Sequence, residues 1–330
     1  MSTLGTSALT LVDWAKRVNA DDKIAQIVEV LNKSNEIIGD MAWVEGNLPT
    51  GHKTTVRSGI PSATWRLMNY GVQPSKSTTV QVTDACGMLE TYSQVDAALV
   101  NLAGDKAEFR ASEDRAFLEG MNQTFATALM KGNSSVNPEK IMGFMPRFSD
   151  ATNAENKGNI LKGGGTGSDN TSIWLVVWSD QTVHGIFPKG SKAGLSVEDL
   201  GQQTIILSDG SMYEGYRTHF KWDCGLCVRD WRYVVRIANI SNAALTKTGS
   251  TGADLVDLIT QAIELVPNIN MGRPALYCNR TIKSFLRRQV VNKTNVHLTL
   301  DQVAGNHVLS FDGIPVRRVD AIGIDETTVS

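Results

Sequence analysis

The residues best suited to chemistry in this chain are four cysteines and five histidines. Cys224 and Cys227 are separated by two residues, a spacing found in zinc sites and redox pairs. A zinc site needs two further soft ligands, and the nearest candidate, His219, lies in a strand-like run. The histidines are His52, His184, His219, His297 and His307, and none belongs to an H-E-x-x-H pattern. We therefore predict no metal site and expect both cysteines to be small core residues with free thiols.

The glycine-rich stretch Gly163–Gly167 would bind phosphate only in a suitable context. A phosphate loop needs a Lys-Ser/Thr pair opening a helix, and a dinucleotide fingerprint needs a strand before it and a helix after it. Here polar residues and a strand follow, so we predict a mobile surface loop. No G-x-S-x-G elbow is present. Asp13, Asp21 and Asp22 are predicted to cap helices, and His184 to be a hydrogen-bonded structural histidine.

These patterns predict no catalytic residue, no metal and no cofactor, and so a protein that is not an enzyme. An enzyme whose site is assembled from distant residues stays open as an alternative, and it would be a small oligomer with a deep polar cleft. A basic run on one predicted helix could contact nucleic acid, but we favour a solvated face near the end of that helix. Its residues are Arg280, Lys283, Arg287 and Arg288.

The composition fits an ordinary globular protein. The chain has 330 residues, 42% of them hydrophobic and 20% charged, with a net charge of −2. This charge gives no global attraction to nucleic acid, so only weak, non-specific contact with DNA is expected. The N-terminus lacks the basic and apolar blocks of a signal peptide, and no apolar run reaches the roughly 20 residues of a membrane helix. We expect folding in a cytosol, with no membrane partner.

The segment from Gly46 to Ala85 is the most informative element. It is rich in threonine and β-prone, with Gly and Pro at its bends, and it has little of its own to bury. Structureless loops longer than about 12 to 15 residues are uncommon inside compact domains, so we interpret it as a β-ribbon arm that lies on another subunit. Its cations would protect the strand edges and set register, and its apolar residues would be the buried anchors. The contact candidates are Lys53, Arg57, Trp65, Arg66, Leu67, Met68 and Lys76.

The remaining pattern predicts mixed helices and strands. Two helices are expected before the ribbon, the second ending at Gly39, and a helix is expected over residues 88–103 after it. The longest helix should span residues 105–131, with Phe109, Met121, Phe125 and Leu129 on its apolar stripe and Arg110 and Glu113 facing outward. Strands are predicted over residues 173–178, 183–187, 204–207, 213–220, 227–240 and 276–278. Helices over 253–266 and 279–289 and a hairpin turning at Asp312-Gly313 complete an α+β pattern.

This order of elements resembles the major capsid protein of tailed bacteriophages, the Hong Kong 97-type fold. Four local phrases are similar to capsid proteins of short-tailed, epsilon15-like phages, and the resemblance covers nearly the whole chain. They begin at Trp43 (WVEGNLPTG), Asn69 (NYGVQPSKS), Asp230 (DWRYVVRI) and Phe311 (FDGIPV).

The resemblance implies four named parts. Residues 1–39 would be the N-terminal arm and residues 40–86 the extended loop. Residues 87–148 and 213–240 would form the peripheral domain around the spine helix 105–131, and residues 241–330 the axial domain. Residues 149–212, a loop plus strands, are left unassigned.

The resemblance also implies the function and its partners. The chain would self-assemble as hexamers and pentamers into an icosahedral shell that encloses double-stranded DNA. Its partners would be a portal protein, a cement or decoration protein, and a scaffolding protein that is separate because few residues precede the ribbon. It would assemble in the bacterial host cytoplasm and reside in the virion. No lysine–asparagine cross-link is predicted for Lys53 or Lys76.

A tail or connector subunit is the other structural alternative, and it would form tubes or rings. Imaging separates shells from rings and from compact particles. Deletion of residues 50–76 is expected to leave the core folded and to prevent shell formation.

Overall fold

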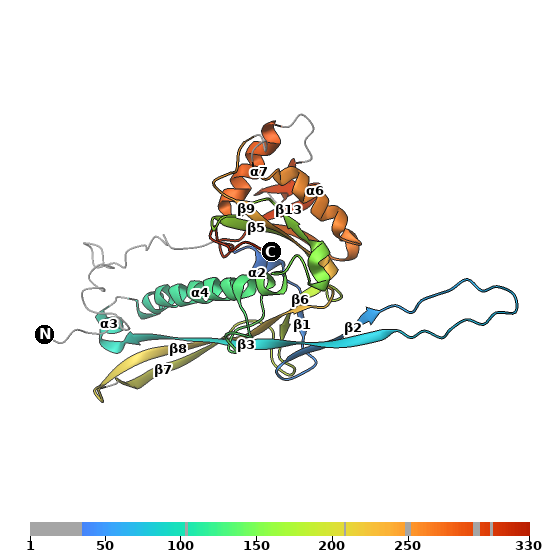
Figure 1. The fold of residues 1–330 in the computed structure, drawn as a ribbon. Coiled ribbons are helices and arrows are strands. Elements are labelled where there is room, and N and C mark those ends of the chain that lie inside the picture. Colours follow the sequence, from blue (N-terminus) through green and yellow to red (C-terminus); the bar gives the residue numbers. More distant parts are fainter. Residues whose placement is uncertain (1–34, 103–104, 208, 248–251, 293–297, 304–305) are drawn as a thin grey trace. The chain divides into compact units, whose positions relative to one another are not determined.

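The computed structural model of the chain describes residues 35–102, 105–207, 209–247, 252–292, 298–303 and 306–330 (Figure 1). The first predicted helix and the caps at Asp13, Asp21 and Asp22 lie outside these residues. Of the second predicted helix, expected to end at Gly39, only the end is described, and there the short helix α2 spans Ile37–Asp40. The chain divides into two compact units. Among the described residues, the hairpin unit comprises 88–126 and 194–223, and the sheet unit comprises 35–87, 127–193 and 224–330. Two strands and one helix, β3 (Thr78–Asp96), β8 (Met212–Val228) and α4 (Lys106–Lys131), contribute residues to both units.

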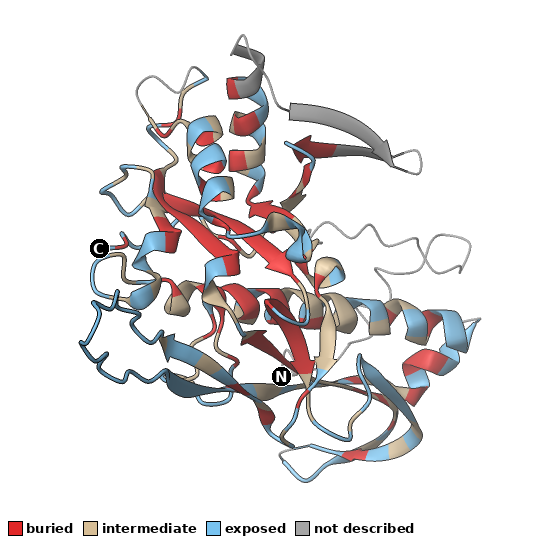
Figure 2. Cartoon of the chain, turned by 90° about the vertical axis from the view of Figure 1, so that its right-hand side faces the viewer, coloured by how far each residue is buried: buried red, intermediate tan, exposed pale blue. Residues whose placement is uncertain are grey.

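The sheet unit is built around strand β5 (Asn170–Trp178), in which every residue is buried. Alternate residues of a strand point to opposite faces, so a strand buried on both faces reads as a continuous apolar run. Ile173, Leu175 and Val177 belong to a large hydrophobic cluster, whereas Trp174 and Trp178 contact Phe144 of the short helix α5 (Phe144–Arg147). Figure 2 shows these central strands as the most buried part of the unit.

Strands on both sides of β5 complete this sheet. On one side β5 pairs antiparallel with β10 (Arg273–Cys278), which pairs parallel with β13 (Ile314–Arg318). On the other side it pairs antiparallel with β9 (Val234–Ser241) and, at one position, parallel with β6 (Val183–Phe187). The remaining strands are short or peripheral. They are β1 (Trp43–Glu45) beside β6, β4 (Ile160–Lys162) beside β9, and the β11 (Leu298–Val303) and β12 (Asn306–Phe311) hairpin beside β13.

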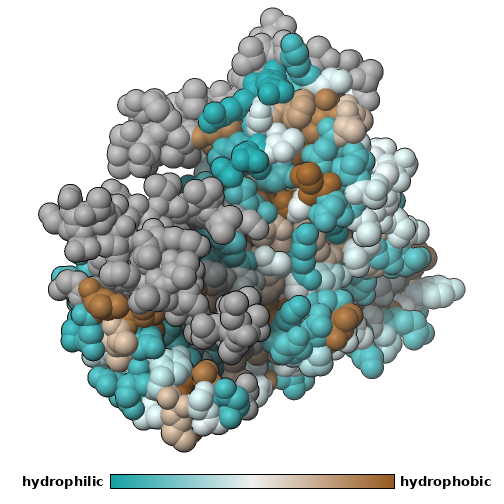
Figure 3. Space-filling model, turned by 90° about the vertical axis from the view of Figure 1, so that its left-hand side faces the viewer, coloured by the Kyte–Doolittle hydropathy of each residue, from teal (hydrophilic) through white to brown (hydrophobic). Residues whose placement is uncertain are grey.

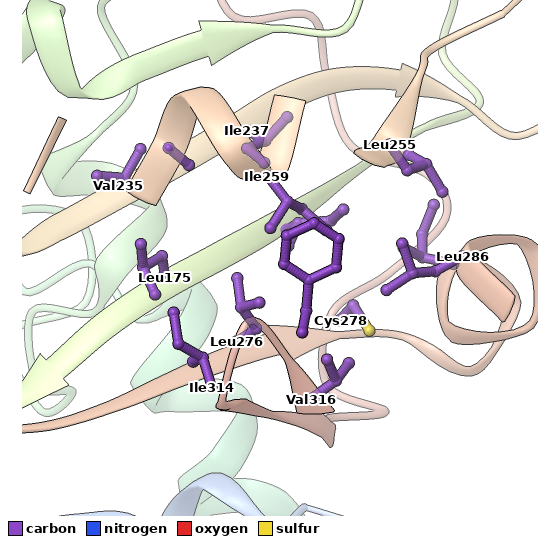
Figure 4. Packing of buried hydrophobic residues seen from close by; sticks show 14 of the residues in the cluster. Leu175, Val235, Ile237, Leu255, Ile259, Leu276, Cys278, Leu286, Ile314 and Val316 are labelled. Carbon is purple, nitrogen blue, oxygen red and sulfur yellow. The ribbon is translucent and has the colours of Figure 1, made fainter. Parts of the chain in front are cut away.

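Two helices cover one face of this sheet, as the apolar periodicity predicts. Helix α6 (Leu255–Leu265) is capped by Asp254, and helix α7 (Arg280–Asn292) is capped by Asn279, whose Oδ1 accepts from the Ile282 amide at 2.8 Å. The close-up in Figure 4 shows the resulting cluster, in which strand residues pack against helix residues. It shows Leu175, Val235, Ile237, Leu255, Ile259, Leu276, Cys278, Leu286, Ile314 and Val316.

The hairpin unit contains the β7 (Ser196–Ile206) and β8 hairpin, helix α3 (Ala97–Leu102) and most of α4. β7 and β8 pair antiparallel from Ser196↔Lys221 to Ile206↔Met212. The predicted long helix is confirmed, because α4 begins after Asp105, whose carboxylate accepts from two amides of the first turn. Phe109, Met121 and Phe125 are buried as expected. Glu113, predicted to face outward, is instead buried.

The predicted helix over residues 88–103 is wrong. Strand β3 continues to Asp96, and only Ala97–Leu102 is helical. Within the hairpin unit β3 pairs with β8, and burial alternates so that Ser93 and Val95 face inward. Leu89, Tyr92 and Leu99 fit a helical spacing equally well, and pairing with a neighbouring strand decided the outcome.

The single strand predicted over 227–240 is also wrong. β8 ends at Val228, the Asp230 side chain caps a short 3-10 turn at Trp231–Tyr233, and β9 begins at Val234. The two strands pair with different partners, β6 and β5, which requires the turn between them.

The hairpin turn at Asp312-Gly313 is confirmed, and both of its residues have positive φ. Gly163–Gly167 lies beside the end of β9, held by amides of Gly163 and Gly165 that donate to backbone oxygens of that strand at 2.7 Å. Arg280, Arg287 and Arg288 are exposed on α7, as a solvated face requires. No described helix is long and apolar enough to cross a membrane.

Candidate subunit-contact loop

Strand β2 (Gly51–Gly59) and the first half of β3 form the ribbon expected from the sequence. They pair antiparallel from Gly51↔Ala85 to Gly59↔Thr78, with one irregularity between Arg57 and Gly59. Side-chain hydrogen bonds reinforce both ends of the pairing. Asn47 exchanges two bonds of 2.7 Å with the backbone of Lys53, and the Ser58 and Thr78 hydroxyls lie 3.0 Å apart.

The base of the ribbon is attached to the rest of the sheet unit by a buried ion pair. The Arg147 guanidinium donates to Asp84 Oδ1 at 2.7 Å, and the Asp84 side chain is 3% exposed. Arg147 also donates to the backbone oxygens of Met142 and Leu226. Gly51 is required at this base, because a Cβ there would clash with the Asp84 carbonyl oxygen. The base is therefore fixed by contacts within the subunit.

The tip of the ribbon has no such support. Residues 60–77 leave the paired strands as an irregular loop (Figure 1), and every one of them is exposed (Figure 2). Two local hydrogen bonds shape the loop: the Ser75 hydroxyl donates to the Ser62 carbonyl, and the Tyr70 amide to the Leu67 carbonyl. Asn69, between the last two, has a φ of 64°. Asparagine is one of the few side chains that tolerate this conformation.

The structure places all seven predicted contact residues on this ribbon and loop. Trp65 is fully exposed at 104%, and Leu67 and Met68 are 75% and 89% exposed. The four cations, Lys53, Arg57, Arg66 and Lys76, are exposed, and none pairs with a carboxylate among the residues that the structure describes.

Sequence reasoning missed three further exposed apolar residues on the same loop: Ile60, Tyr70 and Val72. Their signal was available, because they are apolar residues in a segment with neither helical nor strand periodicity. With Trp65, Leu67 and Met68 they form one apolar set, which we call the loop anchors. Isolated surface hydrophobic residues are ordinary, but six within thirteen residues indicate a surface that another molecule covers.

A groove in the hairpin unit is a candidate for the cleft that the enzyme alternative predicts. It has a volume of about 450 Å³ and lies between β3 and α4, lined mainly by apolar or small residues. Glu90 is the one ionisable residue among its lining, and it is within 3.3 Å of His219 and 3.5 Å of Lys221. This groove does not have the polar character that the enzyme alternative predicts.

Comparison with known proteins decides the family. Residues 19–330 match the family described as major capsid protein GP7. The chain belongs to this family of major capsid proteins.

Solved structures agree with this assignment. A chain in the structure of bacteriophage Epsilon15 is 37% identical, has a TM-score of 0.80, and is matched over 99% of its length by all of this chain. A chain of the bacteriophage JBD30 capsid is 10% identical with a TM-score of 0.52, over 89% of this chain and 92% of that one. This second match supports the fold alone. No curated protein matches the chain.

The fold is the Hong Kong 97-type capsid fold, and the chain is a shell-forming major capsid protein of a tailed bacteriophage. The main interpretation of the sequence is confirmed over the tail and connector alternatives. A capsid protein assembles with copies of itself and resides in the virion.

Proposed function

We propose that the loop anchors and the four ribbon cations contact a neighbouring subunit of the shell. The observation that carries the proposal is the full exposure of Trp65 in the isolated chain. A large aromatic side chain contributes nothing to its own subunit from this position, whereas at an interface it is a typical hot-spot residue.

We expect the loop anchors to contribute more to the affinity between subunits than the cations do. Burying an apolar side chain of this size contributes about 1.5 to 3 kcal/mol. An exposed ion pair contributes about 0.2 to 1 kcal/mol. We therefore assign affinity to Trp65, Leu67 and Met68, and register and encounter rate to Lys53, Arg57, Arg66 and Lys76.

The structure refines the deletion that tests this proposal. Removal of residues 50–76 would delete all of β2 and leave the ribbon half of β3, residues 78–85, without its partner strand. Replacement of residues 60–77 by Asn-Gly retains every β2–β3 pair and closes the hairpin with a favourable two-residue turn. We expect this variant to keep the thermal unfolding midpoint and far-UV circular dichroism of the unassembled protein, and to form no shells by negative-stain imaging.

Single substitutions give the matched comparison. Met68→Ala removes an 89% exposed methionine from the loop, and Met212→Ala removes a 66% exposed methionine from the start of strand β8. Both should leave unfolding unchanged, and only Met68→Ala, like Trp65→Ala, should raise the protein concentration needed for assembly. Equal effects of the two methionine variants would contradict a special role for the loop.

The remaining parts of the chain are assigned from its membership of the capsid protein family. We assign residues 1–39 to an N-terminal arm, residues 40–86 to the extended loop and residues 241–330 to an axial domain. Residues 87–148 and 213–240, with the spine helix, are assigned to a peripheral domain. The shell encloses double-stranded DNA with only weak non-specific contacts, and assembly takes place in the host cytoplasm. The proposed partners are a scaffolding protein, a portal and a cement protein, and we propose no catalytic role for the chain.

A further inference from the structure

Three side chains with metal-binding chemistry, His52, His184 and Cys227, meet at the base of the ribbon within the sheet unit, and the Asp84 carboxylate lies beside them. His52 of β2 is the register partner of Asp84 of β3, and His184 of β6 is the register partner of Cys227 of β8. Two cross-strand pairs from four strands are thus brought to one place, although the residues are far apart in the sequence.

The distances suit a shared ligand. One donor atom each from His52, His184 and Cys227 lies within 4.8 Å of the other two. The two imidazole rings are 5.6 Å apart and nearly perpendicular, at 86°. His184 and Cys227 are 1% and 0% exposed, whereas His52 is only partly buried and provides a route of entry from solvent.

The hydrogen bonding of this cluster is incomplete. His52 Nδ1 has no hydrogen-bond partner among the described residues. His184, predicted to be a structural histidine, is buried, and the Ser179 backbone is the one polar group that interacts closely with its ring, which leaves a second ring nitrogen without a partner. A buried polar group without a partner costs about 1 to 3 kcal/mol, so these nitrogen atoms in one cluster require an explanation.

We propose that His52, His184 and Cys227 bind a zinc ion, with water as the fourth ligand and the Asp84 carboxylate beside the site. Imidazole nitrogen and thiolate sulfur are the preferred ligands of zinc, and a tetrahedral site places them about 3.3 to 3.6 Å apart. Closing the observed spacing needs a shift of about 1 Å, which side-chain rotation provides.

The surrounding charges support this chemistry in most respects. Burial lowers the pKa of His184 and of His52, which favours the neutral ring that a metal requires. Burial and the Asp84 carboxylate raise the pKa of the Cys227 thiol, so zinc must displace its proton. Arg147 holds Asp84 Oδ1 and leaves Oδ2 directed elsewhere, as an outer residue orienting a ligand would. The nearby Arg229 charge opposes cation binding and limits the affinity.

Such an ion would join β2 to β6 and β8, and so fix the base of the extended loop. Three observations that sequence spacing did not connect are then explained together: two neighbouring histidines with unpartnered ring nitrogens, a buried thiol beside them, and a carboxylate next to that thiol. The site is independent of the proposal that the loop tip contacts a neighbour, since it lies at the opposite end of the ribbon.

Cobalt substitution tests the site in the full-length, unassembled protein. After treatment with a chelator, titration with Co²⁺ should give thiolate-to-cobalt charge-transfer and tetrahedral d–d bands that saturate at about one ion per chain, and Zn²⁺ should displace them. Zn²⁺ should also raise the thermal unfolding midpoint. Cys227→Ser should abolish the charge-transfer band, and His52→Gln should weaken binding at least about tenfold.

Matched controls lie in the same chain. Cys224→Ser changes an equally buried cysteine three residues away, and His219→Gln changes a histidine of the hairpin unit. Both should retain the wild-type cobalt spectrum. Absence of the charge-transfer band in the wild-type protein, or equal loss of it in Cys224→Ser and Cys227→Ser, would overturn the proposal. If Cys227→Ser does not fold, the His52→Gln variant provides the test, because His52 is partly exposed and its replacement is better tolerated. An unchanged cobalt affinity in His52→Gln also overturns the proposal.

Discussion

At the scale of single residues, the most deeply buried ion pair among the described residues of the sheet unit joins Arg236 to Glu326. Arg236 of β9 donates to Glu326 Oε2 at 2.8 Å, and the two side chains are 4% and 5% exposed. Arg236 also donates to the Phe148 carbonyl oxygen and lies over the Trp174 ring. Burial lowers the pKa of Arg236, and Glu326 opposes this shift by stabilising the cation. The pair ties the C-terminal segment to the central sheet.

Removing one member of this pair should be far more harmful than removing both. Arg236→Met leaves the Glu326 carboxylate buried with only the Ser172 hydroxyl donating to it, at a cost of about 3 to 5 kcal/mol in unfolding free energy. Replacing both residues by apolar ones, as in Arg236→Met with Glu326→Leu, should recover much of that loss. Urea unfolding of the unassembled protein measures both quantities. An Arg236→Met variant within 1 kcal/mol of wild type would show that the pair is not buried as described.

At the scale of elements, an ion pair joins helix α4 to strand β7 in the hairpin unit. Arg110 donates to Asp199 Oδ1 at 2.6 Å and lies over the Tyr216 ring. Asp199 also accepts from the Gly201 amide at the irregularity in β7. The hydrogen bond from Arg110 is the largest cause that lowers the pKa of the Asp199 carboxyl from its ordinary value of 3.8, and the bond from the Gly201 amide is the second. Because Asp199 is 58% exposed, the stabilisation is small.

This pair predicts a defined dependence on pH. A carboxyl with a lowered folded pKa stabilises the fold fully above its unfolded value of 3.8, and this contribution is lost as the pH falls through the folded pKa. Asp199→Asn should therefore lower the unfolding free energy by less than about 1 kcal/mol at pH 7, and the difference from wild type should disappear well below pH 3.8. A double-mutant cycle with Arg110→Gln, measured at pH 7 and at low pH, isolates the pairwise coupling. A coupling that is unchanged at low pH would contradict the assignment.

The sequence predicted the elements whose signals are local. Helix α4 has a capping Asp105 and an apolar stripe, and α7 has a capping Asn279, so both were predicted close to their observed bounds. The continuation of β3 through Met88–Asp96 was missed because strand pairing is non-local, and a spacing of three residues fits either structure.

The contact loop and the histidine cluster also differ in how far the sequence predicts them, because the first has local signals and the second depends on strand pairing. The exposure of Trp65 could be predicted, because its segment has no periodicity and no partner of its own. The meeting of His52, His184 and Cys227 could not, because it depends on the register of two separate strand pairs.

At the scale of the whole molecule, we expect assembly to depend more on where the charges lie than on the net charge. The net charge is −2, yet the ribbon and loop carry four exposed cations. On the face drawn in Figure 3, hydrophobic residues occur as small groups among hydrophilic ones. Contacts over such a mixed surface are steered by charge as well as by apolar burial, and steering is screened by salt.

The assembly rate should therefore fall as salt is added. The Debye length shortens from about 10 Å at 0.1 M ionic strength to about 3 Å at 1 M, which removes attraction between loop cations and a neighbour's carboxylates before contact. The initial rate of shell formation, followed by light scattering, should fall several-fold over this range. Replacing Lys53, Arg57, Arg66 and Lys76 by glutamine should slow assembly at low salt and flatten the salt dependence.

A second quadruple variant separates the position of the charges from their number. Replacing Arg280, Lys283, Arg287 and Arg288 by glutamine takes the net charge from −2 to −6, as the loop variant does, but changes helix α7 instead. If the loop cations steer association, the α7 variant keeps the wild-type salt dependence, whereas general repulsion between more negative subunits would slow both variants alike. Identical behaviour of the two variants would show that the loop cations do not steer association. The loop anchors would then be the part of the ribbon that acts in assembly.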